Sequence, residues 1–154
     1  MFREMRRSDK KLSNEEMLEV LDTVEYGVLS TIGADGFPYG VPVNFIYKDN
    51  KIYFHAAMTG HKLDNFAYND KVSFCVVTDV ALLPSAFSTK FKSVIAFGTV
   101  KEVAENEKNE IYLLFLEKLS KDFVEAGKDY INKAGANAKV FQIDVLHMTA
   151  KGKK

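Results

Sequence analysis

Residues 55–64 combine side chains and backbone groups that could bind an anion. His55 ends an apolar segment, and a break at Gly60 is followed directly by His61 and Lys62. The residues after the break predict a short helix, whose first turn has backbone N–H groups without helical partners. Those donors, the positive end of the helix dipole and the lysine ammonium together favour a phosphate. A solvated surface turn with two basic side chains is the alternative.

The segment from Gly40 to Asn44 could bind a second kind of group. Proline has no N–H to donate to a neighbouring strand, so Pro42 predicts a sheet edge or a bulge. Backbone groups left free there must find partners, and a planar heterocycle with donors and acceptors along its edge could supply them. A protected sheet edge would explain the same residues, and Asn44 could equally face solvent.

Ser93 follows a basic residue and could be a further phosphate ligand, or it could be the polar start of a strand. No metal site is expected, because none of the three histidines has the i, i+4 spacing of a helical zinc site. The sequence shows no nucleophile motif and no paired acid and base, so no catalytic residue is assigned. Any redox chemistry would therefore belong to a bound cofactor.

The composition predicts one globular domain over residues 1–154, with 47% hydrophobic residues to form its core. The 21 basic and 21 acidic residues balance, which does not favour a nucleic-acid partner. No apolar run reaches the roughly 20 residues that span a bilayer, and no signal peptide is recognised. We therefore expect a cytoplasmic protein without a membrane partner. The single cysteine, Cys75, excludes an internal disulfide and is predicted to be buried.

Hydrophobic periodicity predicts a mainly β chain with peripheral helices. A capping box at Ser13 and Glu16 begins a helix over about residues 13–24, and further helices are expected within about 106–134. The six predicted strands are residues 27–32, 37–47, 52–57, 71–78, 93–103 and 139–148. Because closure removes exposed edges, these strands predict a closed or nearly closed antiparallel barrel.

Three further features of the strands have structural consequences. Residues 72–77 are apolar at nearly every position, so both faces of this strand are expected to be covered. Residues 79–90 are predicted to form a loop. Gly98 interrupts a strand and predicts a bulge or a close approach of two backbones.

Several short motifs, in their order along the chain, resemble the pyridoxamine 5′-phosphate oxidase-related flavoproteins, and within them the branch associated with 5-nitroimidazole resistance. These motifs are Met5 to Asp9, Tyr26 to Thr31, Asp35-Gly36, Pro38 to Phe45, Ile52 to Ala57, Gly60 to Asn65 and Ser93 to Gly98. The similarity covers roughly residues 5–104, and the remainder more loosely. The resemblance implies a six-stranded antiparallel split β-barrel, usually a homodimer, with FMN at the subunit interface.

The resemblance also implies three groups of cofactor-binding residues. Those along the isoalloxazine ring would be Pro42, Val43 and Asn44. Those around the phosphate would be His55, Ala56, Gly60, His61 and Lys62. Those on a neighbouring strand would be Ser93 and Val94.

The activity implied by the resemblance is that of an FMN-dependent oxidoreductase. Its electrons would come from NAD(P)H or a reduced carrier and pass to a small organic acceptor, such as a nitroaromatic compound. The residues with which the true oxidases hold their substrate's phosphate are not recognisable here, so vitamin B6 oxidation is not implied. Two alternatives remain open: a flavin-binding or sensing module without turnover, and a haem-binding barrel with His55 or His61 as axial ligand.

Overall fold

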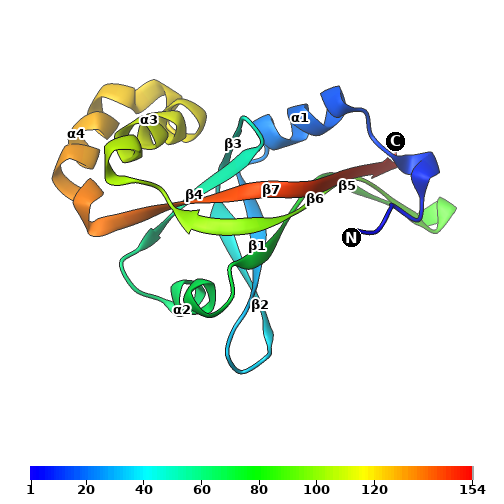
Figure 1. The fold of residues 1–154 in the computed structure, drawn as a ribbon. Helices are drawn as coiled ribbons and strands as arrows, with labels where there is room; N and C mark the ends of the chain where they lie inside the picture. The colour runs from blue at the N-terminus through cyan, green and yellow to red at the C-terminus, as the bar shows by residue number, and fades with distance from the viewer. Residues whose placement is uncertain (154) are drawn as a thin grey trace.

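The computed structural model describes residues 1–153 and shows an antiparallel β-sheet with helices at its periphery (Figure 1). The seven strands lie in the order β2-β1-β5-β6-β7-β4-β3. Their bounds are β1 Tyr26–Ile32, β2 Pro38–Asn44, β3 Ile46–Lys48, β4 Lys51–Ala57, β5 Lys71–Leu83, β6 Ser88–Glu102 and β7 Ala138–Lys153. The α-helices are α1 Asn14–Thr23, α2 His61–Tyr68, α3 Lys108–Leu119 and α4 Val124–Ala134.

The two edge strands of the sheet, β2 and β3, are consecutive in the chain and are separated only by Phe45. Because one residue joins the two edges, the sheet must curl until its edges meet, and Phe45 is fully buried in the curl. β2 pairs with β1 and β3 pairs with β4, so the barrel is split rather than closed. The predicted antiparallel split barrel is confirmed. The predicted count of six strands is wrong by one, because the strand expected over residues 37–47 is divided at Phe45.

The barrel interior holds the larger of two hydrophobic cores. Its members include Leu29, Phe54 and Phe74, which lie on three different strands and are almost completely buried. Burial of each such side chain contributes roughly 1.5–3 kcal/mol. A second core, which includes Phe115 and Val140, lies between α3 and the strands β3, β4 and β7. This core holds the helical layer against the end of β4 that leads into α2.

The helix start at Ser13 has the predicted capping box. The Ser13 hydroxyl accepts a hydrogen bond from the Glu16 backbone N–H at 3.1 Å, and the Glu16 carboxylate accepts one from the Ser13 N–H at 3.0 Å. These two bonds satisfy backbone donors that the first turn of α1 would otherwise leave free.

The prediction at Gly98 is also confirmed. The register between β6 and β7 shifts between Phe97 and Gly98, so that Phe97 pairs with His147 and Gly98 with Val145. A Cβ atom at Gly98 would overlap the carbonyl oxygen of Asp144. Glycine is therefore required here because two backbones approach each other closely.

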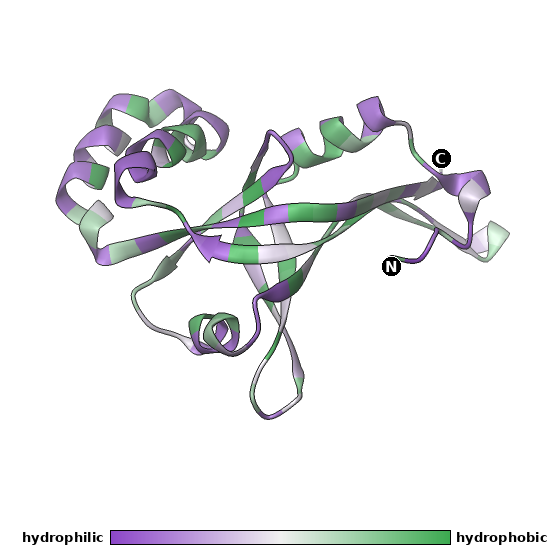
Figure 2. Ribbon diagram, in the orientation of Figure 1, coloured by the Kyte–Doolittle hydropathy of each residue, from purple (hydrophilic) through white to green (hydrophobic). Residues whose placement is uncertain are grey.

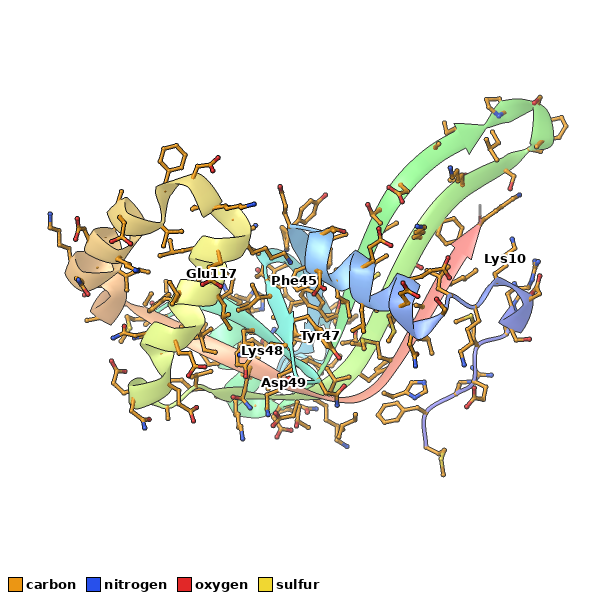
Figure 3. The ribbon with its side chains drawn as sticks, turned by 90° about the horizontal axis from the view of Figure 1, so that it is seen from above. Lys10, Phe45, Tyr47, Lys48, Asp49 and Glu117 are labelled. Atoms are coloured by element: carbon orange, nitrogen blue, oxygen red, sulfur yellow. The ribbon has the colours of Figure 1, made fainter. Side chains whose placement is uncertain are left out.

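The predicted loop over residues 79–90 is wrong, because this segment is a hairpin that extends β5 and β6 away from the barrel (Figure 3). A β-bulge between Thr78 and Ala81 interrupts the alternation of apolar and polar residues that would have identified the strands. The tip consists of a 3-10 turn, Pro84–Ala86, followed by Phe87 in the left-handed conformation with φ 50°.

The predictions that Cys75 is buried and that both faces of its strand are covered are wrong for the single chain. Along β5 the side chains alternate: Phe74 and Val76 are buried, whereas Cys75 is exposed and Val77 is 54% exposed. Exposed apolar side chains continue on the same side of β1 and β6, at Val28 and Ile95. We call these four exposed residues, together with Tyr26, the outer face. Figure 2 shows hydrophobic residues along the strands as well as in the helices.

Candidate functional site

The start of α2 offers backbone donors to a ligand. Gly60 precedes the helix with φ 157° and ψ 169°, a conformation that is essentially restricted to glycine. No side chain caps this helix, and its first intrahelical bond runs from the Asp64 N–H to the Gly60 carbonyl at 3.1 Å. The N–H groups of residues 61–63 therefore have no acceptor within the helix. The predicted helix is confirmed, while its role in binding an anion stays a prediction.

A buried hydrogen bond positions α2 against the sheet. The Asn65 side chain is 4% exposed and donates from Nδ2 to the hydroxyl oxygen of Thr31 on β1 at 2.8 Å. That hydroxyl lies 3.5 Å from the Tyr39 carbonyl oxygen on β2, to which it donates. A buried amide without such a partner would cost about 1–3 kcal/mol, so the contact fixes where the helix begins.

Two aromatic rings join the start of α2 to the edge strand β2. The His61 imidazole stacks on the Tyr39 ring, with centroids 3.9 Å apart and planes inclined by 28°. His61 is exposed and Tyr39 is half-buried. The contact gives this corner of the molecule a flat aromatic surface next to the free N–H groups of the helix.

The charge of Lys62 on α2 acts on His55 of β4. Burial is the main cause that lowers the pKa of His55 below its usual value, and the positive charge of Lys62 lowers the pKa further. The His55 ring also meets the Phe115 ring of α3 edge-on, with centroids 5.1 Å apart. The His55 ring is therefore directed toward the helical layer, within the electrostatic reach of Lys62.

A pocket of about 310 Å³ opens beside His55, between β4 and the helices α3 and α4. Six of its lining side chains are large and mainly apolar: Tyr112, Phe115, Leu116, Leu119, Tyr130 and Ile131. We call this the helical pocket. Among the predicted site residues, His55 is the one that lines it.

The predicted isoalloxazine strand lies at the edge of the sheet, as the proline indicated. Pro42 and Asn44 are exposed, whereas Val43 is half-buried against the barrel core. The Asn44 amide donates to the Glu25 carbonyl at 3.0 Å, so part of its hydrogen-bonding capacity holds the start of β1. Because an edge strand has no neighbour on one side, half of the backbone groups of β2 remain available to a ligand.

The chain does not bring all predicted site residues together. Ala56 and Val94 point into the barrel core, so only their backbone could meet a cofactor. Ser93 pairs with Lys151 and His55 with Val140, eleven residues apart on β7. At about 3.3 Å per residue, this separation amounts to roughly 36 Å along the strand. Ser93 and the residues around Lys62 therefore cannot hold the same phosphate within one chain.

Sequence reasoning missed two residues of this region. Tyr39 lay within a recognised motif but was not assigned a role, and its partner His61 is 22 positions away, so no local pattern joins them. Asn65 stands at the fifth position of a short helix that is otherwise mixed in character. The only feature of the sequence that could have singled out Asn65 is its polar side chain on the side of the helix that faces the sheet.

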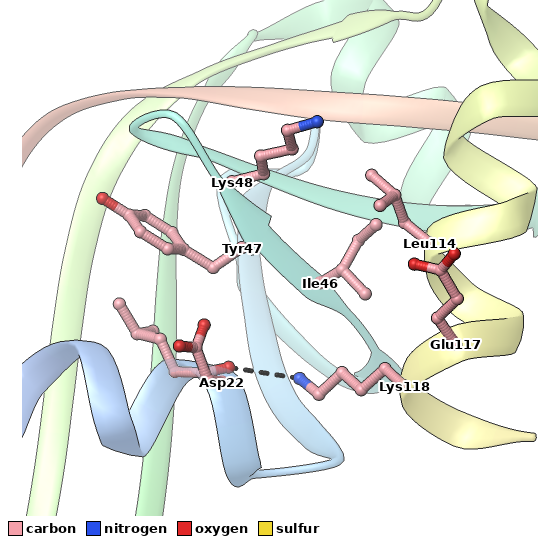
Figure 4. Close-up of a pocket in the computed structure, with 8 residues that line it drawn as sticks. Asp22, Ile46, Tyr47, Lys48, Leu114, Glu117 and Lys118 are labelled. Carbon is pink, nitrogen blue, oxygen red and sulfur yellow. Dashed lines mark hydrogen bonds between the residues drawn. The ribbon is translucent and has the colours of Figure 1, made fainter. Parts of the chain in front are cut away.

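Lys118 of α3 is one of the residues that line a second pocket, of about 430 Å³ (Figure 4). The Lys118 ammonium donates to the carbonyl oxygens of Leu21 at 3.1 Å and Phe45 at 3.0 Å, and it lies 4.0 Å from the centre of the Phe45 ring. Burial lowers the pKa of Lys118 to about 8, against the opposing effect of Asp22 and Glu25. These bonds tie α3 to α1 and to the bend between β2 and β3.

Within residues 1–153, no helix has both the length and the apolar character needed to cross a membrane. In the same part of the chain, no three side chains of His, Cys, Asp or Glu come together as metal ligands.

Comparison with solved structures places this fold among several bacterial proteins. A candidate 5-nitroimidazole antibiotic resistance protein from Bacteroides thetaiotaomicron is 21% identical, with a TM-score of 0.74 over 90% of this chain and 83% of the other. A conserved hypothetical protein from Mycobacterium tuberculosis is 17% identical, with a TM-score of 0.83 over 97% and 90%. An FAD-binding protein from Mesorhizobium loti is 24% identical, with a TM-score of 0.70 over 94% and 98%. At these identities the similarity shows the fold.

No curated protein matches the chain. The sequence does match the family described as pyridoxamine 5′-phosphate oxidase, over residues 13–151. This match extends from the capping box of α1 to Lys151 in β7 and so includes six complete strands, most of β7 and every candidate site residue. The chain therefore belongs to the pyridoxamine 5′-phosphate oxidase family.

Proposed function

We propose that the protein binds a flavin through its FMN portion and is an oxidoreductase. Electrons would pass from NAD(P)H or a reduced carrier to a small organic acceptor, such as a nitroaromatic compound. A bound flavin supplies this redox chemistry, because its ring system accepts electrons and passes them on. The observation that carries the proposal is the uncapped start of α2 beside Lys62 and the aromatic pair of Tyr39 and His61.

The residues present fit the two ends of FMN. The free N–H groups of residues 61–63 and the Lys62 ammonium would hold the phosphate, since both favour negative charge. The free edge of β2, from Pro42 to Asn44, would meet the polar edge of the isoalloxazine through its backbone. Family membership and the FAD-binding relative support a flavin as the ligand.

We also propose that two copies of the chain assemble as a homodimer. The outer face exposes Tyr26, Val28, Val77 and Ile95 together, and it is an apolar surface that a second copy would cover. Ser93 lies on the same side of β6 as Ile95. In such a dimer Ser93 would belong to the partner's site, which would reconcile its distance from Lys62 with a role in cofactor binding.

Haem binding has less support from the side chains. Both candidate axial ligands have an aromatic neighbour, since His61 stacks on Tyr39 and His55 meets Phe115. An absorption spectrum of the purified protein separates the two cofactors, because a flavin gives a yellow protein whereas a haem gives a Soret band. Turnover of NADH or NADPH with a panel of acceptors then separates an enzyme from a flavin-binding module.

The decisive experiment compares FMN and riboflavin binding by calorimetry in the wild type and in Lys62→Ala. A charge-assisted hydrogen bond contributes about 1.5–3 kcal/mol, so the substitution should weaken FMN binding about tenfold to a hundredfold. Riboflavin has no phosphate, and its binding should change little. Lys71→Ala removes an exposed lysine from β5 and serves as the control. Equal losses for both ligands in Lys62→Ala would refute the phosphate assignment.

A further inference from the structure

The helical pocket has the properties of a ligand site for an uncharged aromatic group. Three aromatic side chains, Tyr112, Phe115 and Tyr130, line it, and its described lining contains no Asp, Glu, Lys or Arg. Its volume of about 310 Å³ lies at the lower end of the range for small-molecule sites, about 300–1,000 Å³. A single flat ring system with its attached sugar suits this size better than a complete cofactor does.

The rings of the pocket are held in different ways. Tyr112 is 8% exposed, and its hydroxyl donates to the Gly135 carbonyl at 3.2 Å, so this ring is fixed. Phe115 is 6% exposed and packs against His55. Tyr130 is 71% exposed although it lines the pocket, so a ligand can cover its ring further. The pocket thus offers fixed apolar walls and one exposed aromatic side chain that is free to stack.

The position of the pocket relative to Lys62 indicates which ligand would reach it. His61 turns toward β2, where it stacks on Tyr39, whereas His55 lines the pocket and lies on β4 only five residues before Gly60, the N-cap of α2. A phosphate held at the start of α2 would therefore lie between the edge strand β2 and the helical pocket. A flavin that lies along β2 would end at its phosphate if it were FMN. If it were a dinucleotide, it would continue past the phosphate toward His55.

We propose that the helical pocket binds the adenine ring of FAD, so that the chain prefers the dinucleotide flavin to FMN. The proposal rests on the proposed flavin site, because the phosphate at Lys62 sets the direction in which the ligand extends. The adenine would lie among Tyr112, Phe115 and Tyr130, and His55 and Ser120 offer polar groups to its edge or to the ribose.

The test is calorimetric titration of the full-length chain with FAD and with FMN. We expect the wild type to bind FAD at least tenfold more tightly than FMN. Ala134→Phe places a ring in the pocket from α4 and should remove this preference while FMN affinity stays unchanged. The control is Ala126→Phe, the same substitution at an exposed position of the same helix, which should leave both affinities unchanged.

Tyr130→Ala is the second variant, because an exposed side chain can be truncated without a cavity in the core. It should weaken FAD severalfold and leave FMN unaffected, and it decides the question if Ala134→Phe does not fold. Equal affinity of the wild type for FAD and FMN would overturn the inference and leave the proposed flavin site standing. Failure of both flavins to bind would refute the proposed function as well.

A separate nucleotide could also bring an adenine to the pocket. NADH is therefore titrated into the FMN-loaded wild type and into FMN-loaded Ala134→Phe. If NADH binds the wild type and the substitution abolishes that binding, the pocket belongs to the electron donor, and the assignment to FAD is overturned. NADH binding that is equal in the two proteins supports the assignment to the flavin.

Discussion

His61 stacks on Tyr39 across the gap between α2 and β2, with ring centroids 3.9 Å apart. The pair joins the helix whose first turn would hold a phosphate to the strand whose free edge would hold the flavin ring. The buried bond from Asn65 to Thr31 fixes the same helix from its other side. The spacing between the two proposed halves of the cofactor site therefore depends on two contacts that are far apart in sequence.

Loss of the Tyr39 ring should weaken flavin binding moderately. An aromatic pair contributes about 0.5–1.5 kcal/mol, so Tyr39→Ala should lower the affinity for FMN by about twofold to tenfold. Tyr39→Phe keeps the ring and should bind FMN as the wild type does. Calorimetry on both variants checks this, and a full loss of affinity in Tyr39→Phe would show that the hydroxyl matters instead.

Flavin binding should raise the pKa of His55. In the free chain burial and then Lys62 lower this pKa, and a bound phosphate would stabilise the charged imidazolium. Binding should therefore take up protons, and the affinity for FMN should increase as the pH falls from 7 toward 6. NMR titration of the His55 ring with and without FMN measures the shift.

His55→Gln separates this effect from the titration of the ligand phosphate itself. In this variant the part of the pH dependence that belongs to the imidazole should vanish. A His55 pKa that falls or stays constant when FMN binds would contradict the placement of the phosphate near this side chain.

The stability of the fold should increase with pH between about 8 and 10.5 because of Lys118. Its pKa is about 8 in the folded chain and 10.5 in the unfolded chain. Within that window the unfolded state binds more protons, so the free energy of unfolding rises with pH. Below about pH 8 both states are charged and the contribution of Lys118 is constant.

The comparison with Lys118→Met isolates this contribution, which should reach about 3 kcal/mol over the window of 2.5 pKa units. Urea unfolding at pH 7.5, 9 and 10.5 measures the difference between the two proteins. If that difference does not change with pH, the lysine is not desolvated as the structure shows.

A charge on the outer face should separate the proposed dimer into monomers. Ile95→Asp introduces a carboxylate at a position that is 41% exposed in the single chain and would be buried between two copies. Sedimentation should give a dimer for the wild type and a monomer for the variant at micromolar concentration. Phe123→Asp changes an exposed residue near α4 and should leave the dimer intact. A wild type that is monomeric with flavin bound would remove the dimer from the proposal.

Much of the fold could be predicted because its determinants are local. Ser13 and Glu16 lie three positions apart and define a helix start by themselves, and Gly98 marks a backbone contact that excludes every other residue. The hairpin over residues 79–90 was missed because its bulge disrupts the period of two on which strand prediction depends. Cys75 was misjudged because the apolar character of a strand does not reveal whether one chain or two must cover it.

The candidate site was less accessible to sequence reasoning. The segment after Gly60 could be recognised because a helix start, a glycine and a lysine are consecutive. The contacts of His61 with Tyr39 and of His55 with Phe115 depend on how the sheet curls and where α3 packs. The helical pocket arises from two helices and a strand whose sequences look individually like ordinary amphipathic segments.

The bulge between Thr78 and Ala81 limits which deletions the hairpin of β5 and β6 can accept during evolution. Before it, the odd-numbered residue Val77 lies on the side of Ser93. Beyond it, the even-numbered residue Leu82 pairs with Thr89, which lies on that same side. The extra residue thus reverses the parity of the strand and keeps both apolar side chains on one surface. Deletion of one residue at the bulge would restore the plain period of two and leave Leu82 four positions after Val77, on the same surface and still opposite Thr89. Deletion of two residues would carry Leu82 to the opposite surface, so this arm should accept the loss of its one extra residue but not of two.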